Sequence, residues 1–178
     1  METIHYRIME QKELERIGEI DRKEEWTFKY VYKDGELQKE PVHYQITRWD
    51  EQQVAEHSDM LLPLLQEGGS MVGAFAGEML VGVAVLGNRL LGEKQDLLQM
   101  AFLYVSHAFR RQGIAQRLMD NMCELAVARG AAGLYISATE SGSAVGFYLD
   151  YGCELAERVD PELFAKEPAD IHLILRFA

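Results

Sequence analysis

Two adjacent arginines and a glycine lie where an apolar strand is predicted to pass into a helix. Arg110 and Arg111 follow the alternating stretch 101–105, and Gly113 opens a well-patterned helix. A helix N-terminus presents unpaired backbone N–H groups and the positive end of the helix dipole, and glycine lets the backbone approach a ligand closely. These residues are therefore candidates to hold a phosphate or pyrophosphate. In isolation, however, so short a pattern is more often a surface connection between a strand and a helix, with basic residues that are merely solvated.

Two common phosphate-binding motifs are absent from the sequence. No GxxxxGK(S/T) occurs, which argues against a P-loop nucleotide hydrolase. No GxGxxG follows a predicted strand, which argues against a dinucleotide-binding Rossmann unit. If the segment around Gly113 binds an anion, it therefore does so by a motif other than these two.

A second motif, SAVGFYLDYGC at residues 143–153, follows the next predicted strand. Together the two segments resemble the GNAT N-acetyltransferase superfamily. The first is similar to its acetyl-CoA motif, a strand ending in valine and then (R/Q)xxGx(G/A), and the second to its Axx(F/L)YxxxG(F/C) element. The defining positions are occupied by Arg110, Gly113, Ala115, Ala144, Phe147, Tyr148 and Gly152. This likeness is specific over residues 97–153 and elsewhere rests on the order of elements.

The resemblance implies acetyl-CoA as co-substrate. It implies that the N–H groups of residues 111–116 hold the pyrophosphate, and that the pantetheine lies where strand 97–106 splays from strand 132–140. Main-chain groups at Leu103 and Val105 would then bind the pantetheine and the acetyl carbonyl. Ser141 stands where relatives frequently have asparagine, which weakens one pantetheine contact. The residues implied at the cofactor are Leu103, Tyr104, Val105, Arg110, Arg111, Gln112, Gly113, Ile114, Ala115, Gln116, Ser141, Ala144 and Tyr148.

Catalysis in such a site is direct attack of a neutral amine on the thioester. Tyr148 matches the tyrosine that serves as general acid in many relatives, and a phenol with a pKa of ~10 keeps its proton at neutral pH. The alternative is that this ring only packs. Gln99 occupies the position closest to the family's frequent glutamate base, and a neutral amide does not accept the proton. Asp96 or Glu140, acting through water, are the candidate bases.

The whole chain, residues 1–178, is predicted to form one N-acetyltransferase domain. The antiparallel middle and the strand–helix–strand unit at 97–140 predict an α/β (α+β) fold. We expect a single mixed, mainly antiparallel sheet, splayed in the middle and with helices on both faces, as in the GNAT acyltransferase fold. Strands are predicted over 4–9, 70–90 (a hairpin), 97–106, 132–140 and 170–177, and helices over 12–25, 50–68 (interrupted or ended near Pro63), 113–129 and 141–152.

A hairpin insert is predicted at 26–46, with its turn at Asp34-Gly35. Alternation places Trp26, Phe28, Tyr30 and Tyr32 on one face of this ribbon. That face either packs on the core or forms a lid or wall over a binding cleft.

Charge and composition limit the partners and the location. Lys and Arg total 18 against 29 acidic residues, a net charge of −11, which disfavours nucleic acid and favours cationic partners. The longest apolar stretch, 71–87, is too short to span a membrane and is broken by Glu78. The N-terminus does not resemble a signal peptide. Two cysteines without CxxC spacing and scattered histidines argue against a metal site and predict a cytoplasmic protein.

These observations favour transfer of an acetyl group to a primary amine on a small cationic molecule, such as a polyamine, an aminoglycoside or a streptothricin-like antibiotic. Two alternatives remain: a protein or peptide N-acetyltransferase, and a non-catalytic acyl-CoA-binding module. A homodimer is compatible with the sequence, which does not define the oligomeric state.

Overall fold

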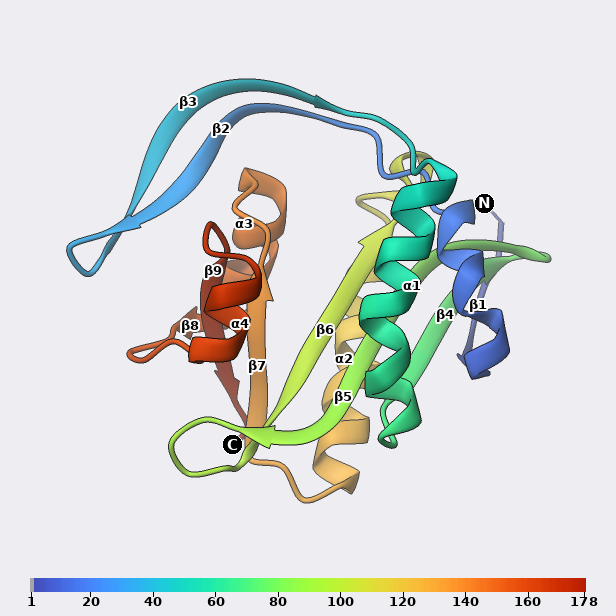
Figure 1. The fold of residues 1–178 in the computed structure, drawn as a ribbon. Coiled ribbons are helices and arrows are strands. Elements are labelled where there is room, and N and C mark those ends of the chain that lie inside the picture. The colour runs from blue at the N-terminus through green and yellow to red at the C-terminus, as the bar shows by residue number, and fades with distance from the viewer. Residues whose placement is uncertain (1) are drawn as a thin grey trace.

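The structure, a computed structural model, describes residues 2–178 as a seven-stranded sheet with helices on both faces and a separate hairpin (Figure 1). In chain order the elements are β1 (Ile4–Met9), the 3-10 helix η1 (Gln11–Glu19), β2 (Glu24–Lys33), β3 (Glu36–Ile46), α1 (Glu51–Gln66), β4 (Ser70–Ala76), β5 (Met79–Leu91), β6 (Leu97–Val105), the 3-10 turn η2 (His107–Phe109), α2 (Ile114–Ala128), β7 (Gly133–Ala138), α3 (Gly142–Tyr151), β8 (Glu154–Leu155), α4 (Pro161–Lys166) and β9 (Ile171–Arg176).

The large sheet is mixed and mainly antiparallel. Its strand order is β1-β4-β5-β6-β7-β9-β8, and within residues 2–178 only β6 and β7 pair in parallel. Helix α2 connects these two strands, because a parallel pair needs a long crossover. The predicted fold class is therefore confirmed, with the parallel pair inside the sheet rather than at an edge.

Strands β6 and β7 separate along their length. Four residue pairs join them, the last being Met100 with Ile136. Along its other edge β6 pairs with β5, and the register shifts at Ala101, which has no partner on β5. Such a bulge bends its strand and increases the local twist. The bend begins where pairing with β7 ends, and the two strands diverge toward their C-terminal ends (Figure 1).

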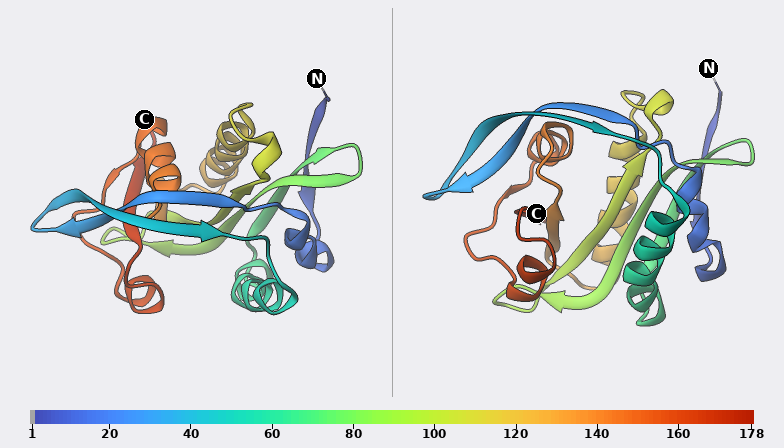
Figure 2. Two further views of the ribbon diagram at one scale, coloured as in Figure 1. Left: turned by 90° about the horizontal axis from the view of Figure 1, so that it is seen from above. Right: turned by 45° about the horizontal axis from the view of Figure 1, so that its top comes forward.

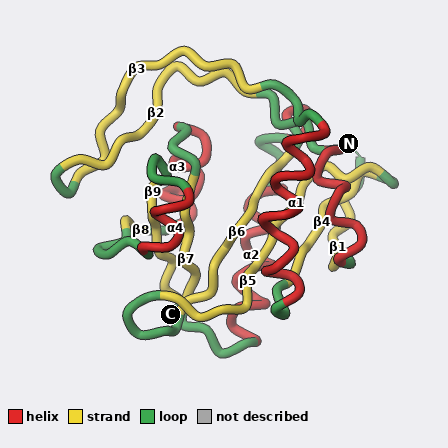
Figure 3. Tube along the Cα trace, in the orientation of Figure 1, coloured by secondary structure: helices red, strands yellow, loops and turns green. Residues whose placement is uncertain are grey.

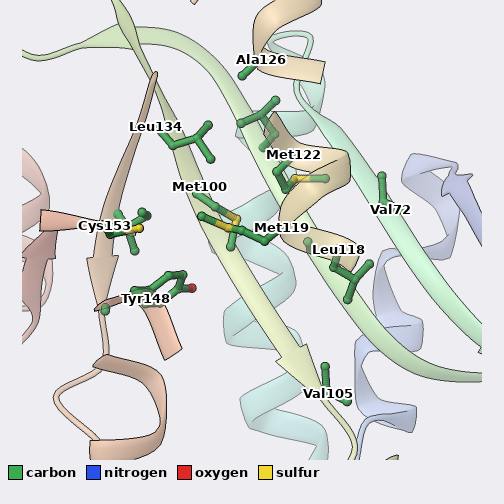
Figure 4. Close-up of a cluster of buried hydrophobic side chains, with 14 of the residues drawn as sticks. Val72, Met100, Val105, Leu118, Met119, Met122, Ala126, Leu134, Tyr148 and Cys153 are labelled. Atoms are coloured by element: carbon green, nitrogen blue, oxygen red, sulfur yellow. The ribbon is translucent and has the colours of Figure 1, made fainter. Parts of the chain in front are cut away.

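Two layers of helices bury the two faces of the sheet. Helices α2 and α3 lie on one face, and α1, η1 and α4 lie on the other (Figure 2, left). On the first face, Leu118, Met119 and Met122 of α2 pack in one cluster with Met100 of β6 and Tyr148 of α3 (Figure 4). The diverging strands β6 and β7 leave a gap between them. The side chains of α2 and α3 fill the end of this gap nearest the paired residues and fix both helices beside it.

The hairpin of β2 and β3 reaches over α3 and the ends of the diverging strands (Figures 1 and 3). The Tyr30 N–H donates to the Glu140 carbonyl at 2.8 Å, and Lys29 forms an isolated β-bridge with Ser141. The ring of Phe28 lies so close to Gly142 that a Cβ there would meet it at 2.5 Å. The hairpin is therefore tied to the turn between β7 and α3 by main-chain bonds and by close packing.

Two predicted helices differ from the structure. The helix expected over 12–25 is a 3-10 helix that ends at Glu19, because Asp21 is held in place by Ser106 Oγ, which accepts its N–H at 2.9 Å, and by the His107 N–H, which donates to its carbonyl at 2.7 Å. The helix over 50–68 continues through Pro63 to Gln66, since a proline this near the end removes only one late hydrogen bond.

Candidate active site

The N-terminus of α2 lacks the side-chain cap that the other α-helices have. Asp50, Ser141 and Asp160 cap α1, α3 and α4 by accepting a backbone N–H of the first turn. The corresponding residue of α2 is Gly113, which has no side chain to offer and adopts a left-handed conformation with φ 81° and ψ 4°. Within residues 2–178, α2 is thus the one α-helix whose first turn is left open to an external acceptor.

Several backbone donors before and in this first turn lack an acceptor in the protein. The first hydrogen bond of α2 runs from the Arg117 N–H to the Gly113 carbonyl at 3.0 Å. In the described part of the chain, no N–H of residues 111–116 donates to a protein acceptor. Arg111 also has a positive φ, of 59°. Successive N–H groups in such alternating conformations form a concave anion site, which agrees with the pyrophosphate cradle that the sequence predicts.

The Arg110 guanidinium is committed to protein partners. Its Nε donates to the Val105 carbonyl at 3.1 Å, and its Nη1 lies 3.8 Å from Oε1 of Glu24 at the start of the hairpin. Arg111 and Gln112 are exposed. The structure therefore places Arg110 as a tie between the end of β6 and the hairpin, and the donors left free at the start of α2 are mainly backbone N–H groups. A direct contact from Arg110 to the cofactor stays a prediction.

The edge of β6 beyond Met100 is the second part of the site. Residues 102–105 pair with β5 on one side only, because β7 has diverged on the other, and the bulged Ala101 pairs with neither strand. Leu103 and Tyr104, predicted at the cofactor, are half-buried there, and Val105 is buried. Ile114 is buried and Ala115 half-buried at the start of α2, whereas Gln116 is exposed. The structure thus brings this strand edge and the open helix end together at one end of the gap.

Tyr148 lies in this gap from the side of α3. Its side chain is only 7% exposed, and its hydroxyl makes no hydrogen bond with any described residue. Burial raises the pKa of Tyr148 well above its usual value, and Cys153, Tyr104 and Asp170 add to the rise. A phenol in this environment keeps its proton and has that proton free to donate.

Ser141 has a structural role in this fold. Its hydroxyl accepts the Ala144 N–H at 3.1 Å as the cap of α3, and the residue is buried under the hairpin. Ala144 is half-buried in the same first turn. The predicted contacts of these two residues with a cofactor remain predictions.

The two carboxylates considered as bases lie in different places. Asp96 precedes β6 at the closed end of the gap, four residues or ~13 Å along the strand from its last pair with β7, and its Oδ2 accepts from Arg176 at 3.2 Å. Glu140 follows β7 at the open end and lines a cavity under the hairpin. Gln99 pairs in register with Tyr135 in the closed part. Only Glu140 therefore lies at the same end as the α2 N-terminus.

The sequence alone did not single out a further carboxylate, that of Asp170. It precedes β9 and lines the same cavity, and its Oδ2 accepts from Ser137 Oγ of β7 at 2.8 Å. Burial raises the pKa of Asp170 to about 6; the Ser137 hydrogen bond opposes this rise, and Glu167 and Glu140 add to it. Its only signal in the sequence is an acidic residue directly before the last strand, which is too common to identify a base.

The cavity itself has a volume of about 230 Å³ and lies between the hairpin, the end of β7, β9 and α4. Tyr30 and Tyr32 of β2 line it together with Phe164 of α4, Glu140 and Asp170. Tyr32 is also 49% exposed and serves only as cavity wall, whereas Tyr30 both lines the cavity and packs against the core cluster beside α2 and α3.

The sequence model of one family, described as an acetyltransferase (GNAT) domain, matches residues 32–160. The chain belongs to the GNAT acetyltransferase family. A sequence search against curated proteins finds no match. Among the residues described for this GNAT protein, no helix is long and apolar enough to cross a membrane, and no group of three or more His, Cys, Asp or Glu residues is arranged to hold a metal.

Solved structures with the same fold include several acetyltransferases. A nourseothricin acetyltransferase matches with a TM-score of 0.70 and 19% identity, over 96% of this chain and 95% of that one. A proposed streptothricin acetyltransferase from Bacillus anthracis, solved with acetyl coenzyme A, matches with a TM-score of 0.73 and 16% identity over 99% of both chains. The PaiA N-acetyltransferase from Thermoplasma acidophilum, solved with coenzyme A, matches with a TM-score of 0.63 and 15% identity, over 98% and 99%. At these identities the likeness shows the fold.

The raised pKa of Asp170 predicts a pH-dependent stability difference. Its pKa of about 6 in the folded protein exceeds the value of about 3.9 for an unfolded aspartate, so the folded state binds this proton more tightly. Protonation therefore stabilises the fold, and the contribution of Asp170 is lost as the pH rises through 6. We expect Asp170→Asn to be more stable than wild type at pH 8 and to lose that advantage near pH 4.

Urea unfolding of both proteins at several pH values measures this difference, because the other titrating groups are common to the two. A constant difference in unfolding free energy across the range would show that Asp170 titrates normally in the folded protein.

Proposed function

We propose that this GNAT protein transfers the acetyl group of acetyl-CoA to a primary amine on a small cationic molecule by direct attack. The observation that carries the proposal is the open N-terminus of α2 beside the unpaired edge of β6, with the free Tyr148 hydroxyl in the same gap. An anion site and an unpaired strand edge fit a ligand with a pyrophosphate at one end and amide groups along its length.

The chain has the groups that acetyl-CoA requires. The donors at 111–116 would hold its pyrophosphate, and the free edge at 101–105 would pair with its pantetheine amides. Acetyl-CoA supplies the acetyl group activated as a thioester. Two solved proteins of this fold were crystallised with acetyl coenzyme A or coenzyme A, which supports the same use here.

Tyr148 and Asp170 would handle the protons from opposite faces of the sheet. Tyr148 approaches from the α3 face and donates its proton to the leaving sulfur. Asp170 lies beside Ser137 near the open end, close enough to raise the pKa of both Tyr148 and Tyr104. Its carboxylate takes the proton of the attacking amine directly, or Glu140 does so through water. Asp96, at the closed end, is not part of this proposal.

The acceptor is proposed to be cationic because the cavity combines aromatic and acidic side chains. Tyr30, Tyr32 and Phe164 present ring faces, and Glu140 and Asp170 present carboxylates. The chain as a whole carries a net charge of −11, which attracts cations. The hairpin is bonded to Glu140 across the open end, which favours a small molecule over a polypeptide. Two proteins of this fold are described as acetyltransferases of nourseothricin and of streptothricin, which belong to the proposed class of small cationic substrates.

A glycine pair on one helix tests the anion site. Gly113 and Gly130 lie at opposite ends of α2, with φ of 81° and 79°, and a Cβ on either meets no atom within 4 Å. Alanine at either position therefore costs about 1–2 kcal/mol of backbone strain. We expect Gly113→Ala to weaken coenzyme A binding about tenfold, which corresponds to ~1.4 kcal/mol, and Gly130→Ala to leave it unchanged. Isothermal titration calorimetry measures both, and equal affinities would contradict the proposed site.

Two substitutions test the proton transfers. We expect Tyr148→Phe to lower kcat about 100-fold with coenzyme A affinity unchanged, because only a proton donor is removed. Asp170 must be ionised to accept a proton and has a pKa of about 6. The wild-type kcat/KM is therefore expected to rise from pH 5 to pH 7 and then level off, and Asp170→Asn to lose both the rise and most of the activity.

Glu167→Gln is the matched control for the pH profile. Glu167 raises the pKa of Asp170 through its charge and is exposed outside the cavity. The control should stay active, with the rise of the profile moved to slightly lower pH. A coenzyme A release assay over a panel of amines gives all these rates. Full activity of Tyr148→Phe, or an unchanged pH profile for Asp170→Asn, would remove that residue from its role.

A further inference from the structure

One buried imidazole beside the proposed active site has a nitrogen without a partner. His172, on β9, is 6% exposed and lines the cavity that Asp170 also lines. Its Nδ1 lies 2.6 Å from the Tyr135 hydroxyl, whereas its Nε2 is buried and has no hydrogen-bond partner in the described chain. A buried polar atom left unpaired is costly, so its retention calls for an explanation.

The hydrogen bonds around Tyr135 determine which nitrogen of His172 carries the proton. The Tyr135 oxygen accepts the Asp160 N–H at 2.7 Å. If its own proton goes to His172 Nδ1, every polar atom of the pair is satisfied except Nε2. The opposite tautomer would leave both the Tyr135 proton and Nε2 unpaired, and Tyr135 is only 1% exposed. The favoured arrangement is therefore a neutral imidazole with its proton on Nε2, and burial lowers the pKa of His172 in agreement with a neutral ring.

His172 on β9 and Asp170, directly before that strand, face the same cavity. Alternate residues of a strand share a face, about 7 Å apart, and Asp170 and His172 both line the cavity. The Phe164 ring, 46% exposed on the short helix α4, lies 6.3 Å from the His172 ring between centroids. Phe164 lines the same cavity as His172, and as a surface side chain it can move without disturbing the core.

We propose that the Nε2–H of His172 donates a hydrogen bond to an oxygen of the acceptor substrate, so that the preferred substrates are amines bearing a hydroxyl or carbonyl oxygen several bonds from the reacting nitrogen. This inference rests on the proposed function, since it takes Asp170 as the base that lies next to the reacting amine and accepts its proton. Residues two apart in an extended chain are separated by about 7 Å, and this separation of Asp170 and His172 sets the spacing of nitrogen and oxygen in the substrate. Plain alkylamines and polyamines, which lack the oxygen, leave Nε2 unpaired and are poorer substrates.

The test compares linear amino alcohols of three to six carbons with the alkylamines of the same length, by coenzyme A release. We expect an advantage in kcat/KM of about tenfold, largely in KM, for the amino alcohol that spans the two side chains; this is the size of one hydrogen bond to an otherwise unpaired donor. His172→Phe should remove the advantage and keep activity on the alkylamines. His5→Phe, at an exposed position of β1, is the control and should keep the preference.

A spectroscopic measurement on the wild-type protein covers the case in which His172→Phe fails to fold. Long-range nitrogen–proton NMR of the imidazoles should show His172 protonated on Nε2 alone, and its Nε2 signal should shift on addition of the favoured amino alcohol. Equal rates for the two amine series, or a proton on Nδ1, would overturn the inference while leaving the acetyltransferase proposal intact. If no amine of any class releases coenzyme A, the proposed function fails, and this inference fails with it.

Discussion

Backbone groups at the edges of strands need hydrogen-bond partners, and the facing edges of β6 and β7 lose theirs where the strands separate after Met100 and Ile136. The separation follows from the bulge at Ala101, which bends β6 away at the point where parallel pairing ends. The open edge so formed lies beside the uncapped N-terminus of α2, which leaves from the same strand. A ligand with an anionic end and an amide-bearing chain would satisfy both sets of groups at once, which is the reason for proposing that acetyl-CoA binds there.

The elements around the gap hold it open and enclose it. Arg110 links the Val105 carbonyl to Glu24 of the hairpin, and the Tyr30 N–H links the hairpin to Glu140 beyond β7. The hairpin thus spans from one diverging strand to the other (Figure 1). Its aromatic residues complete a cavity on the face opposite Tyr148, so the proposed acid and the proposed base approach the gap from different sides.

Those parts of the site that depend on local sequence could be predicted. Gly113 predicted the helix start that the structure leaves uncapped, and the resemblance of residues 143–153 to the family's second motif predicted Tyr148 beside it; the roles of both at a cofactor stay predictions. The mixed sheet followed from the order of elements, and its splay was implied by the resemblance to the GNAT family. Long-range contacts could not be predicted: the Asp21 bonds that end η1 involve residues 106 and 107, and the bond between Ser137 and Asp170 joins different strands. The burial of Asp170 and the unpaired nitrogen of His172 depend on the pairing of β7 with β9, which the sequence does not specify.

The central claim, that the open end of α2 and the free edge of β6 form one cofactor site, is tested most directly by backbone amide NMR during a titration with coenzyme A. We predict that the largest shifts occur at residues 111–116 and along 101–105, with little change at the N-terminus of α1, where Asp50 already caps the helix. Shifts of similar size at both helix ends, or none at residues 111–116, would contradict it.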